Sequence, residues 1–132
     1  MDENQGGVIM DVVELCKKSF TLANKDKEYL KKIENLTVSL FIDFKCDVDK
    51  NFAIIVKDSR IEIVKEVANP DFELETTTNN FYDVVSGKTA GLIALALGKI
   101  KLIKGDLAEL TSLIPVLSGL TDFGKKVLES EK

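Results

Sequence analysis

Apolar residues near the start of the chain recur at steps of three and four, the spacing that places side chains on one stripe of an α-helix. This stripe comprises Ile9, Val12, Val13, Cys16, Phe20 and Ala23. It predicts a helix over Val8–Asn24. Tyr29, Leu30 and Ile33 then predict a second, short helical stretch before the period of the pattern changes.

From Leu36 onward, apolar and polar residues alternate, which is the period of a β-strand with a buried face. The alternation and the β-branched runs predict four strands, at Leu36–Phe44, Phe52–Lys57, Ile61–Val67 and Phe72–Thr77. Only Asp58, Ser59 and Arg60 separate the second strand from the third, so these two are expected to form a tight antiparallel hairpin.

After the fourth strand, the pattern indicates two short helices. Asn80 is expected to cap the first of them and Gly87 to end it. The second, Lys88–Leu97, is apolar nearly all round after its first two residues. A helix without a polar face must be enclosed by protein or line a cavity. The apolar residues of this helix therefore either complete the core or surround a ligand.

The last part of the chain predicts one further strand and one further helix. Lys99–Leu102 alternates as a strand, and Asp106 is placed to cap a helix that carries Leu107–Leu117. Pro115 is expected to end or kink that helix. Thr121–Lys132 keeps apolar residues at helical spacing and is expected to dock weakly on the rest of the chain.

A run of strands followed by helices predicts an α+β fold, with a mainly antiparallel five-stranded sheet and helices packed on one face. The chain has 132 residues, of which 45% are hydrophobic, and this is the size of one domain with one core. No linker, repeat or low-complexity tract divides it. We therefore expect a single domain.

The formal net charge of −4 opposes binding to nucleic acid, which requires clustered Lys and Arg. The acidic, polar start of the chain does not resemble a secretory signal, and the longest apolar run, Ala90–Leu97, is far shorter than the roughly 20 residues that span a bilayer. We expect a cytoplasmic location without stable membrane insertion. Transient membrane contact stays open, although Lys17–Lys18 and Lys31–Lys32 are most simply solvated helix faces.

Few residues offer catalytic chemistry. The chain has no histidine, the commonest general base and metal ligand. Cys16 and Cys46 are expected to be free thiols that no imidazole activates. Glu73 and Glu75 alternate with apolar residues and are expected to face water. We therefore expect no catalytic residue, no cofactor and no enzymatic activity.

Asp47–Asn51 resembles the opening of a calcium-binding loop, in which alternate oxygens point at one ion. Phe52 stands where that loop needs glycine, and Asp58 stands where it needs glutamate. We therefore interpret Asp47, Asp49 and Asn51 as turn residues and predict no metal site.

Two segments of the second half carry a family resemblance. Phe81–Lys88 is similar to the short helix that ends in Gly-Lys in the sterol carrier protein type 2 family, and Gly98–Asp106 is similar to that family's "GKLKIxGD" strand. Gly87 and Gly98 are 11 positions apart, as is usual in the family, and Ala94 falls where the family has a small helix residue. The resemblance extends over Leu36–Leu117.

The resemblance implies non-enzymatic binding and carriage of an apolar ligand in an internal tunnel, the ligand being a fatty acid, fatty acyl-CoA, sterol or isoprenoid. It divides the single lipid-binding domain, 1–132, into an N-terminal helical segment (8–34), a sheet with ligand-enclosing helices (36–118) and a tail (121–132). Family position and apolarity together suggest the following lining residues: Phe81, Val84, Val85, Leu92, Leu95, Leu97, Leu110, Leu113, Ile114 and Leu117.

An alternative stays open. The same apolar helices could form a protein interaction or homodimerisation surface, accessory to an enzyme and without a ligand of its own, because family domains also occur as accessory parts of enzymes.

Overall fold

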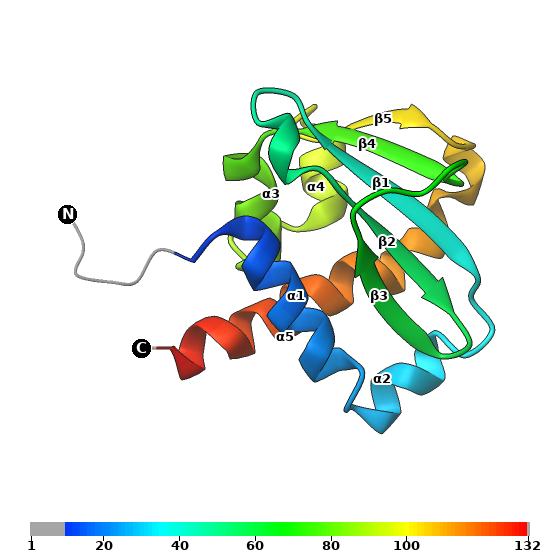
Figure 1. Ribbon diagram of the computed structural model, residues 1–132, viewed down its shortest axis with the longest axis vertical. Coiled ribbons are helices and arrows are strands. Elements are labelled where there is room, and N and C mark those ends of the chain that lie inside the picture. Colours follow the sequence, from blue (N-terminus) through cyan, green and yellow to red (C-terminus); the bar gives the residue numbers. More distant parts are fainter. Residues whose placement is uncertain (1–9, 132) are drawn as a thin grey trace.

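The computed structural model describes residues 10–131 and shows a sheet with helices gathered on one side of it (Figure 1). The elements in chain order are α1 (Val12–Ala23), α2 (Lys27–Lys32), β1 (Val38–Phe44), η1 (Val48–Lys50), β2 (Phe52–Lys57), β3 (Arg60–Val64), β4 (Phe72–Thr76), α3 (Thr78–Val85), α4 (Gly91–Ala96), β5 (Lys101–Lys104), η2 (Leu107–Leu113) and α5 (Ile114–Ser130), where η marks a 3-10 helix.

The five strands form one sheet in the order β3-β2-β1-β4-β5. β1 and β4 are parallel, and the other neighbouring pairs are antiparallel. The predicted α+β fold with a mainly antiparallel five-stranded sheet is therefore confirmed. Asp58 and Ser59 join β2 to β3 with φ angles of 52° and 58°, the left-handed conformation that a two-residue hairpin turn requires.

One core joins the inner face of the sheet to the helices. Along β1, alternate residues from Val38 to Phe44 are buried, as the two-residue period predicts. Phe44 and Phe52 from the sheet meet Phe81 from α3, with ring centroids 5.8 to 6.3 Å apart. This aromatic cluster attaches α3 to the sheet, and α1 and α5 pack against each other (Figure 1).

The first helix begins later than the apolar stripe predicted. Asp11 has an extended backbone and accepts hydrogen bonds from the N–H groups of Val13 and Glu14, so it is the N-cap and α1 begins at Val12. The predicted start at Val8, together with Ile9, lies outside the described residues. The short helix predicted around Tyr29 is confirmed as α2.

The predicted cap of α3 was wrong. Thr77 is the N-cap, and its side-chain oxygen accepts from the N–H of Asn80, which lies in the first turn of the helix. Asn80 instead donates its side-chain amide to the carbonyl oxygen of Lys99, 3.3 Å away. Gly87 has a φ of 87° just after the helix, so its predicted role in ending α3 is confirmed.

The predicted strand at Lys99–Leu102 is displaced. The N–H groups of Lys99 and Ile100 point at the carbonyl oxygen of Ala94 and complete the end of α4, so β5 begins only at Lys101. The strand predicted at Ile61–Val67 ends early, because its pairing with β2 stops at Val64.

The end of the chain differs most from the prediction. The helix expected over Leu107–Leu117 is the 3-10 helix η2 followed by the start of α5. Pro115 lies in the first turn of α5, where proline is tolerated because its missing N–H has no partner there. It therefore begins a helix and does not end one. Phe123 and Val127 are buried, so the expectation that the tail docks only weakly was wrong.

Candidate functional site

An apolar groove of about 210 Å³ lies between α4 and the first half of α5. Its lining comprises Ala90, Gly91, Leu92, Ile114, Leu117, Ser118, Thr121 and Asp122. The α5 members are spaced by three and four residues, so they form one stripe of that helix. Apolar side chains make up most of the groove, and its polar groups come from Ser118, Thr121 and Asp122.

Two local features keep the groove open and position its walls. A Cβ atom on Gly91 would lie 3.3 Å from Cδ1 of Leu117, so the missing side chain leaves space between the helices. On the far wall, the hydroxyl of Thr121 donates a hydrogen bond of 2.7 Å to the carbonyl oxygen of Val84. This bond fixes α5 against α3 and so sets the position of the groove.

The outer side of α4 is uncovered. Ala94 is buried, but the side chains of Leu92, Ile93 and Leu97 are 52%, 55% and 65% exposed. Of the two alternatives expected for this apolar helix, enclosure by protein on every side is therefore not what the structure shows, whereas Gly91 and Leu92 do line a groove. The reason is that α4 has only six residues and packs through one side, the side that carries Ala94 and Leu95.

Comparison of the sequence with known protein families matches residues 15–118 to the SCP-2 sterol transfer family. The match covers most of the chain and includes α3, α4, β5 and the start of α5. The chain belongs to the SCP-2 sterol transfer family. Membership confirms the resemblance seen in the Gly87 and Gly98 motifs, and it implies a domain for lipid binding or transfer.

Solved structures show the same fold. A conserved hypothetical protein of Thermus thermophilus, whose description suggests a sterol carrier protein, has a TM-score of 0.65 at 20% identity, with 93% of this chain and 92% of that one covered. A sterol carrier protein 2 has a TM-score of 0.64 at 19% identity, with 89% and 96% covered. A search of curated proteins found no match.

A third neighbour contains a lipid. It is sterol carrier protein 2 of Aedes aegypti in complex with the C16 fatty acid palmitate, with a TM-score of 0.53 at 13% identity, covering 80% of this chain and 96% of that one. At these identities the likeness shows a shared fold between the SCP-2 domain described here and its neighbours.

The groove of this SCP-2 domain brings together three of the ten residues predicted to line a site, namely Leu92, Ile114 and Leu117. The others are distributed differently. Phe81, Val84, Val85 and Leu113 are buried in the core, Leu95 and Leu110 are half-buried against it, and Leu97 is exposed on the outer side of α4.

Sequence reasoning missed five groove residues: Ala90, Gly91, Ser118, Thr121 and Asp122. The signal for the last three was present. If Pro115 is assigned to the first turn of a helix, the residues from Ile114 onward at steps of three and four give the same stripe that faces α4.

The segment Asp47–Asn51, which resembles the opening of a calcium-binding loop, forms a turn that contains the 3-10 helix η1. Asn51 accepts a 2.6 Å hydrogen bond from the N–H of Phe44 on its side-chain oxygen and donates to the carboxylate of Asp43. Its oxygen is therefore engaged by the backbone of the turn. Within residues 10–131, no group of three or more His, Cys, Asp or Glu side chains is arranged to hold a metal ion.

The two thiols are free and differ in environment. Cys16 is fully buried on α1, and burial raises the pKa of its thiol far above the usual range, so it stays protonated. Cys46 is exposed in the turn after β1. Among the helices of the described chain, none is long and apolar enough to cross a membrane.

Proposed function

We propose that this SCP-2 domain binds the apolar part of one lipid molecule in the groove between α4 and α5 and carries it without making or breaking bonds. The observation that carries the proposal is the groove itself. It is largely apolar, it is open at the surface, and all of its lining residues except Thr121 and Asp122 lie within the segment that matches the family.

Burial of hydrocarbon would supply the binding energy. Each methylene removed from water contributes about 0.8 kcal/mol, so a long chain can bind tightly with few polar contacts. The groove of about 210 Å³ is smaller than the roughly 300 to 1,000 Å³ of a site that encloses a whole small molecule. Binding therefore requires α4 to move away from α5. The short length of α4 and its packing through one side fit such a movement.

The groove also bears on the class of ligand. The hydroxyl groups of Ser118 and Thr121 donate to the carbonyl oxygens of Pro115 and Val84, so their oxygens remain to accept a hydrogen bond, which suits a hydroxyl head group. The nearby Asp122 carboxylate, in contrast, repels a ligand carboxylate. Among a fatty acid, a fatty acyl-CoA, a sterol and an isoprenoid, a sterol or isoprenoid alcohol fits this end of the groove best. The palmitate bound by the Aedes aegypti neighbour supports an acyl chain as the second candidate.

The absence of histidine from the sequence supports binding over catalysis. The two free thiols fit a reducing compartment, and we propose a cytoplasmic location on this basis.

Native mass spectrometry of freshly purified protein tests the proposal first, by detecting co-purified lipid. Titration of delipidated protein with fluorescent sterol and fatty acid analogues follows. Gly91→Leu is expected to fill the groove, because even a Cβ at this position reaches Leu117, and to weaken binding at least about tenfold, which corresponds to about 1.4 kcal/mol.

Ala96→Leu is the matched control. It adds the same side chain to the same helix at an exposed position outside the groove lining, so binding should stay within about threefold of the parent. A folded parent protein that binds no sterol, isoprenoid or acyl probe would refute the proposal.

The alternative of an interaction module draws on a separate observation, the exposed apolar side chains of α4. It predicts a mass that increases with protein concentration, together with the absence of lipid binding. Sedimentation equilibrium of delipidated protein distinguishes the two functions.

A further inference from the structure

One continuous side of α4 is both apolar and exposed. It consists of Leu92, Ile93, Ala96 and Leu97, which we call the α4 face. These positions are related by steps of one, three, four and five residues, so they occupy a single side of the helix, opposite Ala94 and Leu95. Scattered apolar residues are normal on a protein surface, but a helix face without any polar side chain indicates a binding surface.

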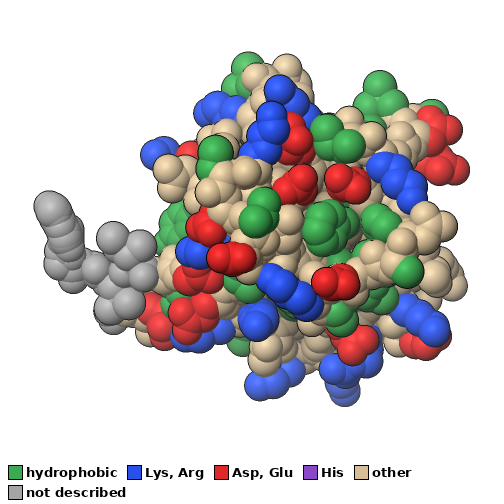
Figure 2. Space-filling view, turned by 45° about the horizontal axis from the view of Figure 1, so that its top comes forward, with side chains coloured by type: hydrophobic (Ala, Val, Ile, Leu, Met, Phe, Trp, Pro, Cys, Tyr) green, Lys and Arg blue, Asp and Glu red, His purple; other side chains and the backbone are tan. Residues whose placement is uncertain are grey.

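The charge around the α4 face has one sign along the chain. Lys88 precedes α4 and Lys99 follows it, both exposed, and the segment 84–105 contains four lysines and no Asp or Glu, although the chain as a whole has a net charge of −4. On the face of the molecule that Figure 2 presents, acidic and basic side chains intermix.

Acidic groups also lie near this segment. Asp83 and Asp106 flank it in the chain, and Glu75 forms an ion pair with Lys45 at 3.5 Å. Glu73 and Glu75 on β4 are in register with Lys104 and Lys101 of β5. Asp122 belongs to the groove lining next to Leu92. Within residues 10–131, neither Lys88 nor Lys99 forms an ion pair with a carboxylate. The two lysines at the ends of α4 therefore remain available to an anionic partner.

We propose that the α4 face docks on an anionic lipid bilayer, with Leu92, Ile93 and Leu97 entering the interface and Lys88 and Lys99 contacting lipid phosphate and carboxylate groups. Apolar side chains at the boundary of the head groups, together with lysines beside them, are the general requirements for binding a helix in the plane of a membrane. Docking itself does not depend on the proposed function, but its consequence does. Because Leu92 belongs both to the α4 face and to the groove, docking would present the groove to the lipid source.

A second copy of the chain fits this surface less well. A two-fold interface would bring the lysines of one α4 face near those of the other, which is unfavourable. The helix is also only about 9 Å long. Its four side chains offer much less than the roughly 800 Å² that each partner buries in a stable complex.

Flotation with vesicles tests the docking surface. The protein is expected to bind vesicles of phosphatidylcholine with roughly 30% phosphatidylserine, to bind pure phosphatidylcholine much more weakly, and to dissociate as salt is raised. Lys88→Gln with Lys99→Gln should lower the partition coefficient about 30-fold, because each lysine near an anionic surface contributes about a factor of five to six.

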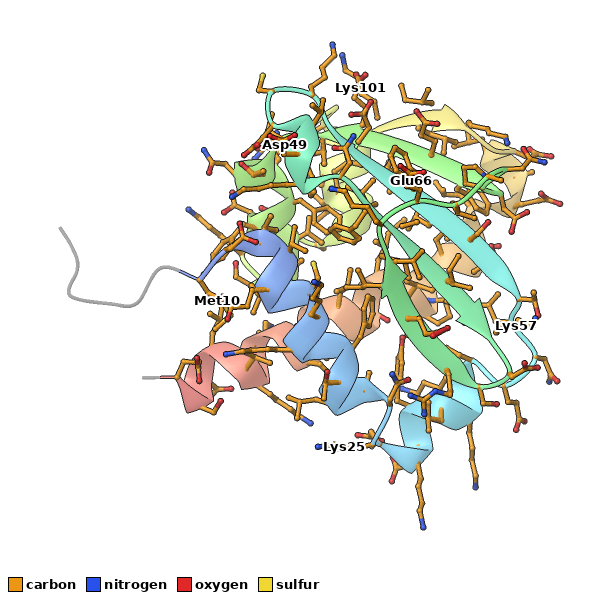
Figure 3. The ribbon with its side chains drawn as sticks, in the orientation of Figure 1. Met10, Lys25, Asp49, Lys57, Glu66 and Lys101 are labelled. Atoms are coloured by element: carbon orange, nitrogen blue, oxygen red, sulfur yellow. The ribbon has the colours of Figure 1, made fainter. Side chains whose placement is uncertain are left out.

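Lys25→Gln with Lys57→Gln is the matched control, since it changes the net charge equally at two exposed lysines that lie well away from α4 (Figure 3). Its partition coefficient should change less than about threefold. A second pair of variants tests the apolar side chains. Ile93→Glu should abolish vesicle binding, whereas the control Leu107→Glu, at another exposed apolar residue, should preserve most of it.

Three results would overturn the proposal: equal losses in both lysine pairs, vesicle binding indifferent to phosphatidylserine, or a concentration-dependent dimer that Ile93→Glu dissociates. Titration with lipid probe in the absence of vesicles distinguishes a failure of the docking proposal from a failure of the proposed lipid-binding function. The Lys88→Gln, Lys99→Gln variant should still bind lipid probe, whereas a protein that docks on vesicles and binds no probe would refute the proposed function and leave the docking surface intact.

Discussion

The hydroxyl of Tyr29 on α2 donates a hydrogen bond of 2.8 Å to the carbonyl oxygen of Pro115 in the first turn of α5. The Tyr29 ring also meets the ring of Phe123 edge to face, with 5.3 Å between centroids. Burial raises the pKa of the Tyr29 hydroxyl, and the nearby Asp122 carboxylate raises it further, so the donor proton is retained. The first half of α5, which forms one wall of the groove, is thus anchored on α2.

Gly119 makes this anchor possible. A Cβ atom at Gly119 would overlap the Tyr29 hydroxyl oxygen, so Gly119→Ala should displace Tyr29 or α5. Overpacking of this kind costs about 1 to 3 kcal/mol, and the better helix propensity of alanine offsets at most about 1 kcal/mol. We expect a lower free energy of unfolding in urea. Ser118→Ala, at the exposed neighbour, should change it by less than about 0.5 kcal/mol; equal effects would show that Gly119 is not a close contact.

Asp11 gives a prediction on pH. Burial alone would raise its pKa, but the Lys50 ammonium and the N–H groups of Val13 and Glu14 together outweigh this effect and hold the pKa below its ordinary value. Because the folded-state pKa is the lower one, this carboxylate stabilises the fold above the unfolded-state pKa. That contribution is lost as the pH falls through the folded-state pKa.

Asp11→Asn keeps a capping side chain and removes the charge. It should lower the free energy of unfolding by less than about 1 kcal/mol at pH 7, because both Asp11 and Lys50 are partly exposed. The difference from the parent should shrink below about pH 4. Urea unfolding at several pH values measures it, and a difference that stays constant down to about pH 3 would contradict the assignment.

The thiols should react at very different rates. Cys46 is exposed, whereas Cys16 is fully buried and its pKa is raised. In the native protein one thiol per chain should therefore react quickly with a disulfide reagent such as dithiobis(nitrobenzoic acid), and the second should react only when the chain unfolds. Cys46→Ser should remove the fast phase. A fast phase that survives this substitution would mean that α1 opens readily.

Features that depend on neighbouring residues in the chain were predictable from the sequence. β2 begins and ends where the run of β-branched residues predicted, Gly87 ends α3, and the side chain of Asp106 accepts from the N–H of Ala108 as an N-cap should. Each of these depends on a few consecutive residues whose backbone preferences agree.

Features that depend on packing between distant segments were not predictable. Proline is compatible both with the end of a helix and with its first turn. At Pro115 the chain adopts the first turn, and the carbonyl oxygen of this residue accepts from Tyr29 of α2, a contact that the local sequence does not reveal. The same limit applies to α4. Its apolar sequence indicates that its side chains need a partner, but it does not say whether protein or another surface supplies it. Three of ten predicted lining residues therefore meet at one groove, and Leu97 lies outside it.

The contrast between the two sides of α4 yields the last prediction, which compares Leu92→Asp with Leu95→Asp. Leu92 is exposed and belongs to the groove lining, so a carboxylate there stays hydrated and should change the free energy of unfolding by less than about 0.5 kcal/mol. It should nevertheless prevent binding of an apolar ligand. Leu95 packs against the core, so a carboxylate there should cost about 2 kcal/mol or more, a large share of the roughly 5 to 15 kcal/mol that stabilises a domain.

Circular dichroism during urea unfolding and probe binding on the same samples separate the two effects. Ile93→Asp is the control, because Ile93 is exposed on α4 outside the groove lining, and both stability and probe binding should stay near those of the parent. If Leu92→Asp bound probe as the parent does, the ligand would lie elsewhere. If Leu95→Asp abolished binding without loss of stability, Leu95 would face the ligand in the bound protein, and α4 would have to rotate on binding.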